Sequence, residues 1–279
     1  MSGSADRAGL KWAFVDSERA EPDLSFRPDS KLVSDVAASP NHEERKDGRA
    51  PDMILLHYTG MQSALAALAR LRDAAGEQKV SAHYFVDDDG TITQLVPEAR
   101  RAWHAGLSFW ENESDVNSRS IGVEIVNPGH EFGYPDFPPH QVDAVIALCR
   151  DVAARHQIRA DRLLAHSDVA PGRKQDPGEK FPWHRLHMAG VGHWVAPTPI
   201  ADTPRLSVGD SGETVSQLQL ELAQYGYGIS VTGDFDAATR DVVAAFQRHF
   251  RPARVDGVAD GSTLTTLTDL LAARPSVAA

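Results

Sequence analysis

Residues 53–76 read MILLHYTGMQSALAALARLRDAAG, and they place a strand pattern directly before a helix pattern. The run MILLH at 53–57 is short and apolar, which is typical of a buried strand. Apolar side chains then recur at helical spacing, and we expect this helix to end at Gly76. A strand followed at once by a helix favours an α/β domain.

The strand and helix patterns continue to alternate beyond this stretch. AHYFV and TITQLV flank the turn residues DDDG and predict a hairpin at 82–96. IGVEIV at 121–126 predicts another strand, and RLLAH at 162–166 predicts a further one. Between them, prolines at 138 and 139 open a helix pattern that runs to about His156. We therefore expect an α/β domain with a mixed central sheet and flanking helices.

Four segments divide the 279-residue chain. Residues 1–50 are polar and poorly periodic and predict an N-terminal arm laid over the fold, whereas residues 51–195 hold the α/β pattern. APTPIADTPR at 196–205 contains three prolines and predicts a linker. Residues 206–279 carry three amphipathic helix patterns and predict a small three-helix domain whose apolar stripes pack on one another.

The composition excludes several classes of partner. A formal net charge of -11 gives no general attraction to nucleic acid or to an anionic membrane. No segment approaches the roughly 20 apolar residues of a membrane span, and the N-terminus lacks the run of about 7–15 apolar residues of a secretion signal. We therefore expect a cytoplasmic protein, with the periplasm as the alternative. The single cysteine, Cys149, lies in a helix-like apolar stripe and predicts a buried structural thiol.

Three side chains of the types that bind zinc lie at the ends of predicted strands or in loops. His57 ends MILLH, His166 ends RLLAH, and Asp176 follows ten residues later in HSDVAPGRKQDPG. A catalytic zinc ion typically has three such ligands and an open fourth position, and it activates water for attack on an amide. The spacing does not match the helical H-E-x-x-H pattern, and a lone His or Asp is more often a structural or surface residue.

The strand IGVEIV also carries an acidic residue among apolar ones. Because side chains alternate along a strand, Val123 and Ile125 point to one face, and Gly122 and Glu124 point to the other. A carboxylate on such a strand needs a partner, and a water molecule activated by a metal would be one. The alternative is an edge-strand glutamate that faces solvent.

Five motifs occur in order along the chain: LLHYTG, SAHYFVDDDGTITQLVPE, WHAG, SIGVEIVNPG and AHSDVAPGRKQDPG. They cover about residues 50–190 and resemble the type-2 N-acetylmuramoyl-L-alanine amidase family, which shares its fold with peptidoglycan recognition proteins. The resemblance implies a zinc hydrolase that cuts the amide bond between N-acetylmuramic acid and L-alanine. It implies Zn²⁺ ligands at His57, His166 and Asp176, a catalytic base at Glu124, and a transition-state stabiliser at Lys174.

Residues around the motif WHAG are candidates for substrate contact. An aromatic face suits a sugar ring and an arginine suits a carboxylate, so we expect Arg101, Trp103 and His104 to line a groove for glycan and peptide. The alternative for His104 is a hydrogen-bonded wall or core position, and the same holds for His83. The histidines outside the motifs predict surface or packing positions: His184, His187, His193 and His249.

The C-terminal stretches LSVGDSGETVSQLQLEL, GDFDAATRDVVAAFQ and VDGVADGSTLTTL resemble the peptidoglycan-binding domain that often accompanies cell-wall hydrolases. We expect this domain to raise the local concentration of enzyme at polymer, and the alternative is that it packs on the α/β domain and shapes its groove. In the cytoplasm the substrates would be muropeptides that carry 1,6-anhydromuramic acid, in wall turnover or recycling. The alternative functions are a non-catalytic recognition module and a hydrolase of another peptidoglycan bond.

Overall fold

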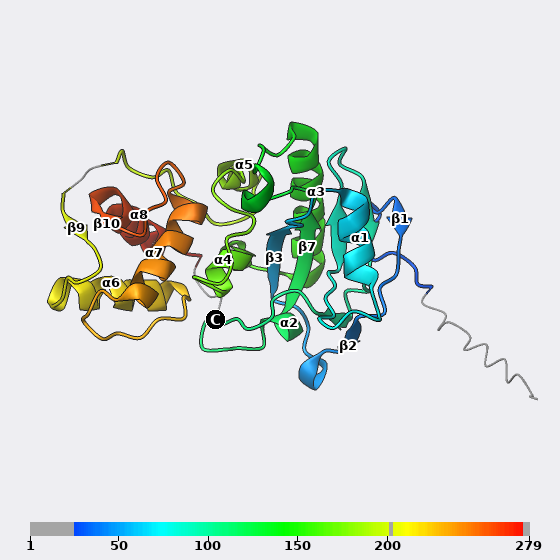
Figure 1. Ribbon diagram of the computed structural model, residues 1–279, viewed down its shortest axis with the longest axis horizontal. Helices are drawn as coiled ribbons and strands as arrows, with labels where there is room; N and C mark the ends of the chain where they lie inside the picture. Colours follow the sequence, from blue (N-terminus) through cyan, green and yellow to red (C-terminus); the bar gives the residue numbers. More distant parts are fainter. Residues whose placement is uncertain (1–24, 201–202, 276–279) are drawn as a thin grey trace, which may run out of the picture.

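The computed structural model describes residues 25–200 and 203–275. The first 24 residues of the predicted arm, two residues of the predicted linker and the last four residues of the chain lie outside the described residues. Within the described ranges, an α/β body is followed by a helical body, and Figure 1 shows the two side by side.

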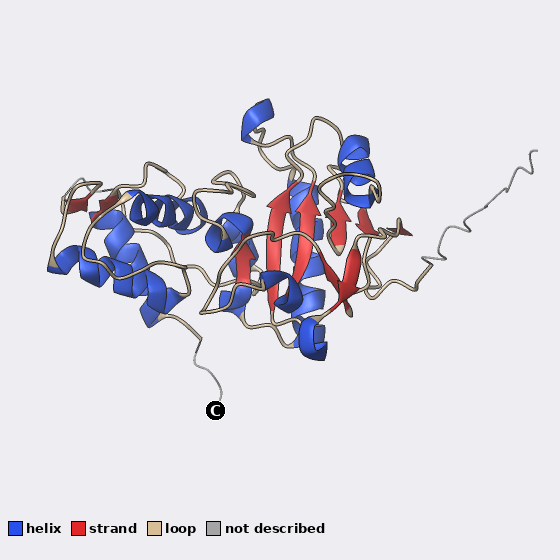
Figure 2. Cartoon of the chain, turned by 60° about the horizontal axis from the view of Figure 1, so that its bottom comes forward, coloured by secondary structure: helices blue, strands red, loops and turns tan. Residues whose placement is uncertain are grey.

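A mixed six-stranded sheet forms the centre of the α/β body, in the order β1-β5-β4-β7-β3-β8. The neighbours β4 and β5 pair antiparallel, and the other neighbours pair parallel. The predicted mixed sheet and the predicted hairpin are therefore confirmed, and Figure 2 shows helices on both sides of the sheet. The strands are β1 (Asp35–Val36), β3 (Met53–Tyr58), β4 (Tyr84–Val86), β5 (Ile92–Gln94), β7 (Ser120–Ile125) and β8 (Leu163–Ala165).

One face of the sheet is apolar because side chains alternate along each strand. Leu56 of β3 points with Val123 and Ile125 of β7 into a fully buried core. The helices α3 (Pro139–His156) and α5 (Trp183–Met188) supply the other side of this core. The helix predicted to run from the two prolines to His156 is confirmed.

The opposite face carries the polar side chains of the two central strands. His57 of β3 and Glu124 of β7 are register partners and lie side by side near the carboxyl ends of these strands. Helix α1 (Ala64–Arg72) covers part of this face, where Leu71 packs in one cluster with Phe85. Open α/β sheets place their ligand sites at the carboxyl ends of parallel strands.

The first helix ends earlier than predicted. It stops at Arg72 rather than at Gly76. The Asp73 carboxylate accepts hydrogen bonds from the backbone N–H groups of Ala75 (2.9 Å) and Gly76 (3.1 Å). These local bonds compete with helical ones and turn the chain away from the helix axis.

The strand predicted at 162–166 is also shorter than expected. It ends at Ala165, and His166 begins the one-turn helix α4 (His166–Val169). The cause is the Asp168 side chain, whose Oδ2 accepts the N–H of Ala165 (2.8 Å) and so folds the chain into a turn.

The described part of the predicted arm adds strands to the α/β body. β1 pairs with β5 at the edge of the central sheet, and β2 (His42–Glu44) pairs antiparallel with β6 (Arg100–Ala102). These pairings satisfy backbone groups that would otherwise lack partners. Short helical elements complete this body: η1 (Lys46–Gly48), α2 (Val116–Arg119), η2 (His130–Phe132) and η3 (Ala160–Arg162).

The C-terminal body contains the three predicted helices, α6 (Glu213–Tyr225), α7 (Ala237–Phe250) and α8 (Gly261–Ala272). The short strands β9 (Arg205–Leu206) and β10 (Ala259–Asp260) pair antiparallel beside them. Among the described helices of the whole chain, none combines the length and the apolarity that a membrane span requires.

The two bodies share one apolar core. The Trp110 ring meets the Tyr227 ring edge to face, with ring centroids 5.0 Å apart. Val169 of α4 belongs to the same buried cluster as Phe246 and Phe250 of α7, and Figure 1 shows α4 beside α7. The helical body therefore packs on the α/β body, which was the alternative expectation for this domain.

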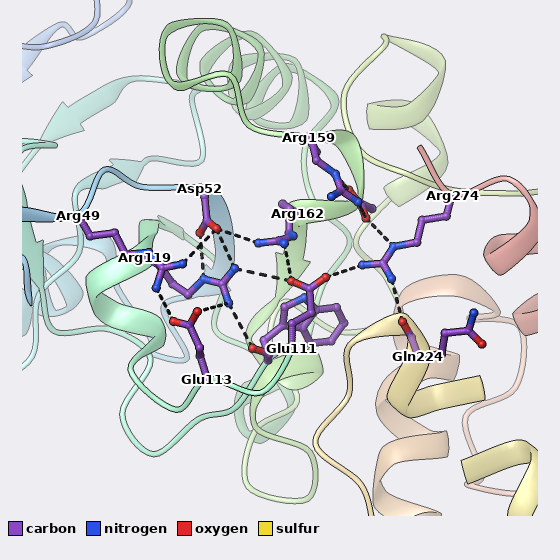
Figure 3. Close-up of polar contacts among 11 residues, drawn as sticks. Arg49, Asp52, Glu111, Glu113, Arg119, Arg159, Arg162, Gln224 and Arg274 are labelled. Carbon is purple, nitrogen blue, oxygen red and sulfur yellow. Dashed lines mark hydrogen bonds and ion pairs between the residues drawn. The ribbon is translucent and has the colours of Figure 1, made fainter. Parts of the chain in front are cut away.

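Ion pairs extend this interface along one edge. Arg274, which follows α8, donates to Asp161 (2.7 Å) and to Glu111 in the α/β body, and to the carbonyl of Gln224 (2.8 Å) in its own body. Figure 3 shows Glu111 bonded to Arg162 as well, so a continuous network of charges joins the two bodies.

Candidate active site

The polar ends of β3 and β7 open into a cavity of about 520 Å³. The loop that follows α4 closes one side of it, and α1 contributes to another. Six of the predicted site residues line this cavity: His57, His104, Glu124, His166, Lys174 and Asp176.

His57, His166 and Asp176 bring three candidate ligand atoms to one point. His57 Nδ1 lies 2.9 Å from His166 Nδ1 and 3.1 Å from Asp176 Oδ2, and His166 Nδ1 lies 2.9 Å from the same oxygen. All three residues are buried, and their ligand atoms lie within 4.8 Å of one another. The residues come from β3, from α4 and from the loop after α4, so three separate segments form the cluster.

A chain of hydrogen bonds assigns the tautomer of His57. Ser120 Oγ donates its proton to the carbonyl of Val116 (2.6 Å), so it accepts from His104 Nε2 (3.2 Å). His104 Nδ1 is therefore an acceptor, and His57 Nε2 donates to it (3.1 Å). With its proton on Nε2, His57 points the lone pair of Nδ1 at the cluster.

His166 has the same tautomer, because its Nε2 donates to the carbonyl of Ala105 (3.1 Å). Two imidazole Nδ1 atoms and a carboxylate oxygen therefore converge on one point, where a cation would be stabilised by all three. Two histidines and one carboxylate form a donor set that zinc accepts, and protein acceptors hold the far N–H groups as is usual for zinc ligands. The residues present fit a zinc ion.

Burial and charge keep two of these groups in the protonation states that ligands require. Burial, followed by the neighbouring His166, lowers the pKa of His57 to about 4. Burial acts to raise the pKa of Asp176, but His166 and His57 outweigh it and hold that pKa well below its usual range. Near neutral pH, His57 is therefore uncharged and Asp176 is ionised.

Glu124 lies beside the cluster with one oxygen unpaired. Its Oε2 is buried and has no hydrogen-bond partner among the described residues. Burial and then Asp176 raise the pKa of Glu124 well above its usual range, and Lys174 acts in the opposite direction. A buried polar atom without a partner is costly and needs an explanation, and proton transfer to or from a bound molecule is one.

Lys174 reaches the cavity from the loop between α4 and Asp176. Its backbone N–H binds the carbonyl of Ala170 (3.1 Å), and the N–H of Ser167 binds the carbonyl of Asp176 (3.0 Å), so the loop folds back on α4. The positive charge of Lys174 acts at the cluster, because it lowers the pKa of both His57 and Glu124.

The residues predicted to contact substrate are placed differently from one another. His104 lines the cavity, but both of its ring nitrogens are engaged, one with His57 and one with Ser120. Its visible role is therefore to support His57, and a contact between His104 and substrate stays a prediction.

Arg101 and Trp103 do not line the cavity. Arg101 pairs with Asp115 (2.9 Å) and with Glu43, and the Trp103 indole N–H also donates to Glu43 (3.2 Å). Both side chains are therefore held by acidic partners, and a contact between substrate and Arg101 or Trp103 stays a prediction.

Sequence reasoning missed the residues that support the candidate ligands. Ser120 completes the hydrogen-bond chain to His57. Gly122 leaves room for His104, since a Cβ at Gly122 would lie 2.5 Å from Cγ of that ring. Asn117 accepts hydrogen bonds from the N–H groups of His104 (3.0 Å) and Ala105 (2.8 Å) and so fixes the WHAG loop. The signal that could have found these supports is the presence of two small residues, Ser120 and Gly122, in a strand whose other residues are larger.

Comparison with known proteins identifies the family to which this chain belongs. Residues 47–179 match the family model described as N-acetylmuramoyl-L-alanine amidase, and residues 211–267 match the model described as putative peptidoglycan binding domain. The N-acetylmuramoyl-L-alanine amidase AmiD of Escherichia coli (strain K12) is 36% identical over 243 residues, which span 78% of this chain and 82% of AmiD. The chain belongs to the N-acetylmuramoyl-L-alanine amidase family.

Solved structures of other proteins are similar to this amidase in their three-dimensional fold. Escherichia coli AmiD in complex with anhydro-N-acetylmuramic acid-L-Ala-D-gamma-Glu-L-Lys has a TM-score of 0.68 at 34% identity, over 80% of this chain and 90% of the other. AMPDH3 from Pseudomonas aeruginosa has a TM-score of 0.66 at 30% identity, over 80% and 92%. The 1,6-anhydro-N-acetylmuramyl-L-alanine amidase AmpD of Enterobacter cloacae is 30% identical but matches only 53% of this chain, with 86% of its own length.

Proposed function

We propose that this amidase uses a zinc ion to hydrolyse the amide bond between N-acetylmuramic acid, or its 1,6-anhydro form, and L-alanine in peptidoglycan fragments. The observation that carries the proposal is the convergence of two imidazole lone pairs and a carboxylate beside the unpaired Oε2 of Glu124. A ligand set next to a base supports catalysis over a recognition module, which needs neither.

The substrate class is proposed from the relatives. AmiD of Escherichia coli was solved with an anhydro-N-acetylmuramic acid peptide, and AMPDH3 of Pseudomonas aeruginosa with an anhydromuramic pentapeptide. The cavity of about 520 Å³ lies within the usual range for sites that hold molecules of this size. A role in wall turnover or recycling follows from this substrate class. Cell fractionation distinguishes the predicted cytoplasmic site of action from the periplasmic one.

The side chains of the site divide the reaction between them. His57, His166 and Asp176 would hold the zinc ion, which when bound lowers the pKa of a water molecule to about 7 and polarises the substrate carbonyl. Glu124 takes a proton from the attacking water and passes it to the amide nitrogen as the C–N bond breaks. Lys174 counters the negative charge that develops on the carbonyl oxygen and also favours the ionised form of Glu124.

Metal analysis and product analysis test the two parts of the proposal separately. We expect one zinc ion per chain in the wild-type amidase and a large loss of zinc in His166→Ala. The matched control is His184→Ala, which removes an exposed histidine outside the cavity and should keep zinc. Undiminished zinc in His166→Ala would reject the ligand assignment.

Mass spectrometry of the products tests the bond. Purified anhydromuropeptide should give anhydromuramic acid with a free carboxyl group and a peptide that begins with L-alanine. Intact sacculi, treated in parallel, show whether polymer is also cut at this bond. Fragments from a different bond would reject the amide assignment while leaving the metal site unaffected.

A further inference from the structure

The helical body touches the α/β body at the segment that carries a candidate metal ligand. Asp168 lies two residues after His166 in α4, and its side chain is completely buried. Its Oδ2 accepts the backbone N–H of Ala165 (2.8 Å), the residue before His166. The Asp168 carboxylate therefore closes the turn of backbone on which His166 sits.

Two further partners of Asp168 come from the helical body. The Tyr227 hydroxyl donates to Asp168 Oδ1 (2.7 Å), and His249 Nδ1 donates to Asp168 Oδ2 (2.6 Å). Tyr227 follows α6, and His249 lies in the last turn of α7. Both side chains are buried, and His249 is stacked between Trp183 and Phe250 with ring centroids 3.7 Å from each. These donors are therefore held in fixed positions.

The helix α4 depends on such contacts because it is one turn long. An isolated turn of helix has too few internal hydrogen bonds to be stable, so its position is set by what surrounds it. The same turn also binds the loop of the third candidate ligand, through the N–H of Ser167 and the carbonyl of Asp176 (3.0 Å). A shift of Asp168 would therefore disturb His166 and Asp176 together.

We propose that Tyr227 and His249 are positioning residues for the metal site, which act through Asp168 to hold His166 in its ligand geometry. The proposal rests on the proposed role of His166 as a zinc ligand. It makes the helical body a structural part of the active site, whatever polymer this body also binds. Neither residue touches substrate or metal, so the expected effect is on zinc affinity.

The chain offers a matched control at the same interface. The Tyr225 hydroxyl forms a hydrogen bond with His193 Nδ1 (2.8 Å), and both side chains are buried. His193 follows α5, so this bond also joins the helical body to the α/β body. Tyr225→Phe and Tyr227→Phe therefore remove the same group from the same interface, but only the second hydroxyl bonds Asp168. An effect that comes merely from loosening the two bodies would be similar in both variants.

Zinc affinity of the full-length chain, measured by competition with a chromophoric chelator, tests the proposal. We expect Tyr227→Phe to weaken zinc binding about tenfold, the lower end of the range for residues that orient metal ligands, and Tyr225→Phe to change it less than about twofold. Thermal unfolding of the metal-free variants serves as the structural control, and the two should lose similar amounts of Tm.

A second pair of variants keeps the test decisive if Tyr227→Phe does not fold. Asparagine at position 249 can place an amide N–H where His249 has Nδ1, whereas glutamine places it near Nε2. We therefore expect His249→Asn to retain more zinc affinity than His249→Gln. Equal zinc affinities within both pairs, in a wild-type chain that binds zinc, would overturn the positioning role alone. A wild-type chain without zinc would overturn the proposed function and the positioning role with it.

Discussion

Removal of the helical body should destabilise the α/β body rather than merely untether it. A chain that ends at residue 200 exposes three large apolar side chains whose buried cluster includes residues of the helical body: Trp110, Leu164 and Val169. Full exposure of such a side chain costs about 1.5–3 kcal/mol, so the three together cost about 5–9 kcal/mol. Because domains are stable by about 5–15 kcal/mol, this loss is comparable to the whole stability of the fold.

The assay compares solubility, thermal unfolding and turnover of a soluble anhydromuropeptide for the full chain and the truncated one. We expect the truncated chain to aggregate through its exposed apolar surface, or to unfold at a much lower temperature. The control is an insertion of four Gly and Ser residues between residues 201 and 202, which lengthens the connection at a cost below about 1 kcal/mol. A truncated chain that stays soluble, unfolds within about 3 °C of the full chain and retains its turnover would refute the reasoning and restore a tethering role.

Three substitutions test individual side chains. Glu124→Gln should keep zinc and lose about 10²–10⁴ in kcat, as expected for a lost general base; near-normal single-turnover rates would rule out that role. Lys174→Ala should also keep zinc and lose about 10²–10³ in kcat, whereas Lys180→Ala, which removes a charge outside the cavity lining, should not change kcat; equal effects of the two would point to general electrostatics. Glu98→Gln tests a contribution to stability. Burial acts to raise the pKa of Glu98, but three hydrogen bonds outweigh it and lower the pKa from 4.5 to about 2. The ionised carboxylate therefore stabilises the fold above about pH 4.5, and this stabilisation is lost as the pH falls towards 2. That drop in pKa corresponds to about 3 kcal/mol at neutral pH. Urea unfolding of Glu98→Gln should show this loss at pH 7, and between pH 5 and 3 the variant should lose less stability than the wild type. A variant as acid-sensitive as the wild type would contradict this assignment of the three donors: Arg155, His156 and Tyr84.

Much of the fold could be predicted because local patterns and tertiary packing agree. The apolar run of β3 and the alternation of β7 each match the faces that these strands bury. In the helical body, the Gly/Asp turns before α7 and α8 lead into equivalent caps, in which Asp236 accepts from the Thr239 N–H and Asp260 from the Thr263 N–H, both at 2.8 Å. The two helices therefore begin with the same N-cap hydrogen bond, from a Thr N–H to the Asp side chain three residues before it.

The end of the first helix could not be predicted from helical spacing. Apolar spacing continues past Arg72, but the Asp73 side chain competes for the backbone N–H groups that would extend the helix. The partners of Arg101 and Trp103 could not be predicted for a related reason. Both side chains bond Glu43, and a long-range pair of this kind leaves no periodic signal in the sequence.

The carboxylate of Asp168 links the stability of the interface to the chemistry of the site. It is completely buried, and three donors satisfy it, one from its own turn and two from the helical body. A buried carboxylate that loses its partners is strongly destabilising, so without the helical body this turn would have to open to water. Opening the turn would move His166 away from His57 and separate the two lone pairs that face each other at 2.9 Å. The proposed metal site would therefore reach its full geometry only when the helical body has docked, and zinc binding would in turn favour the docked state, because the two are linked equilibria.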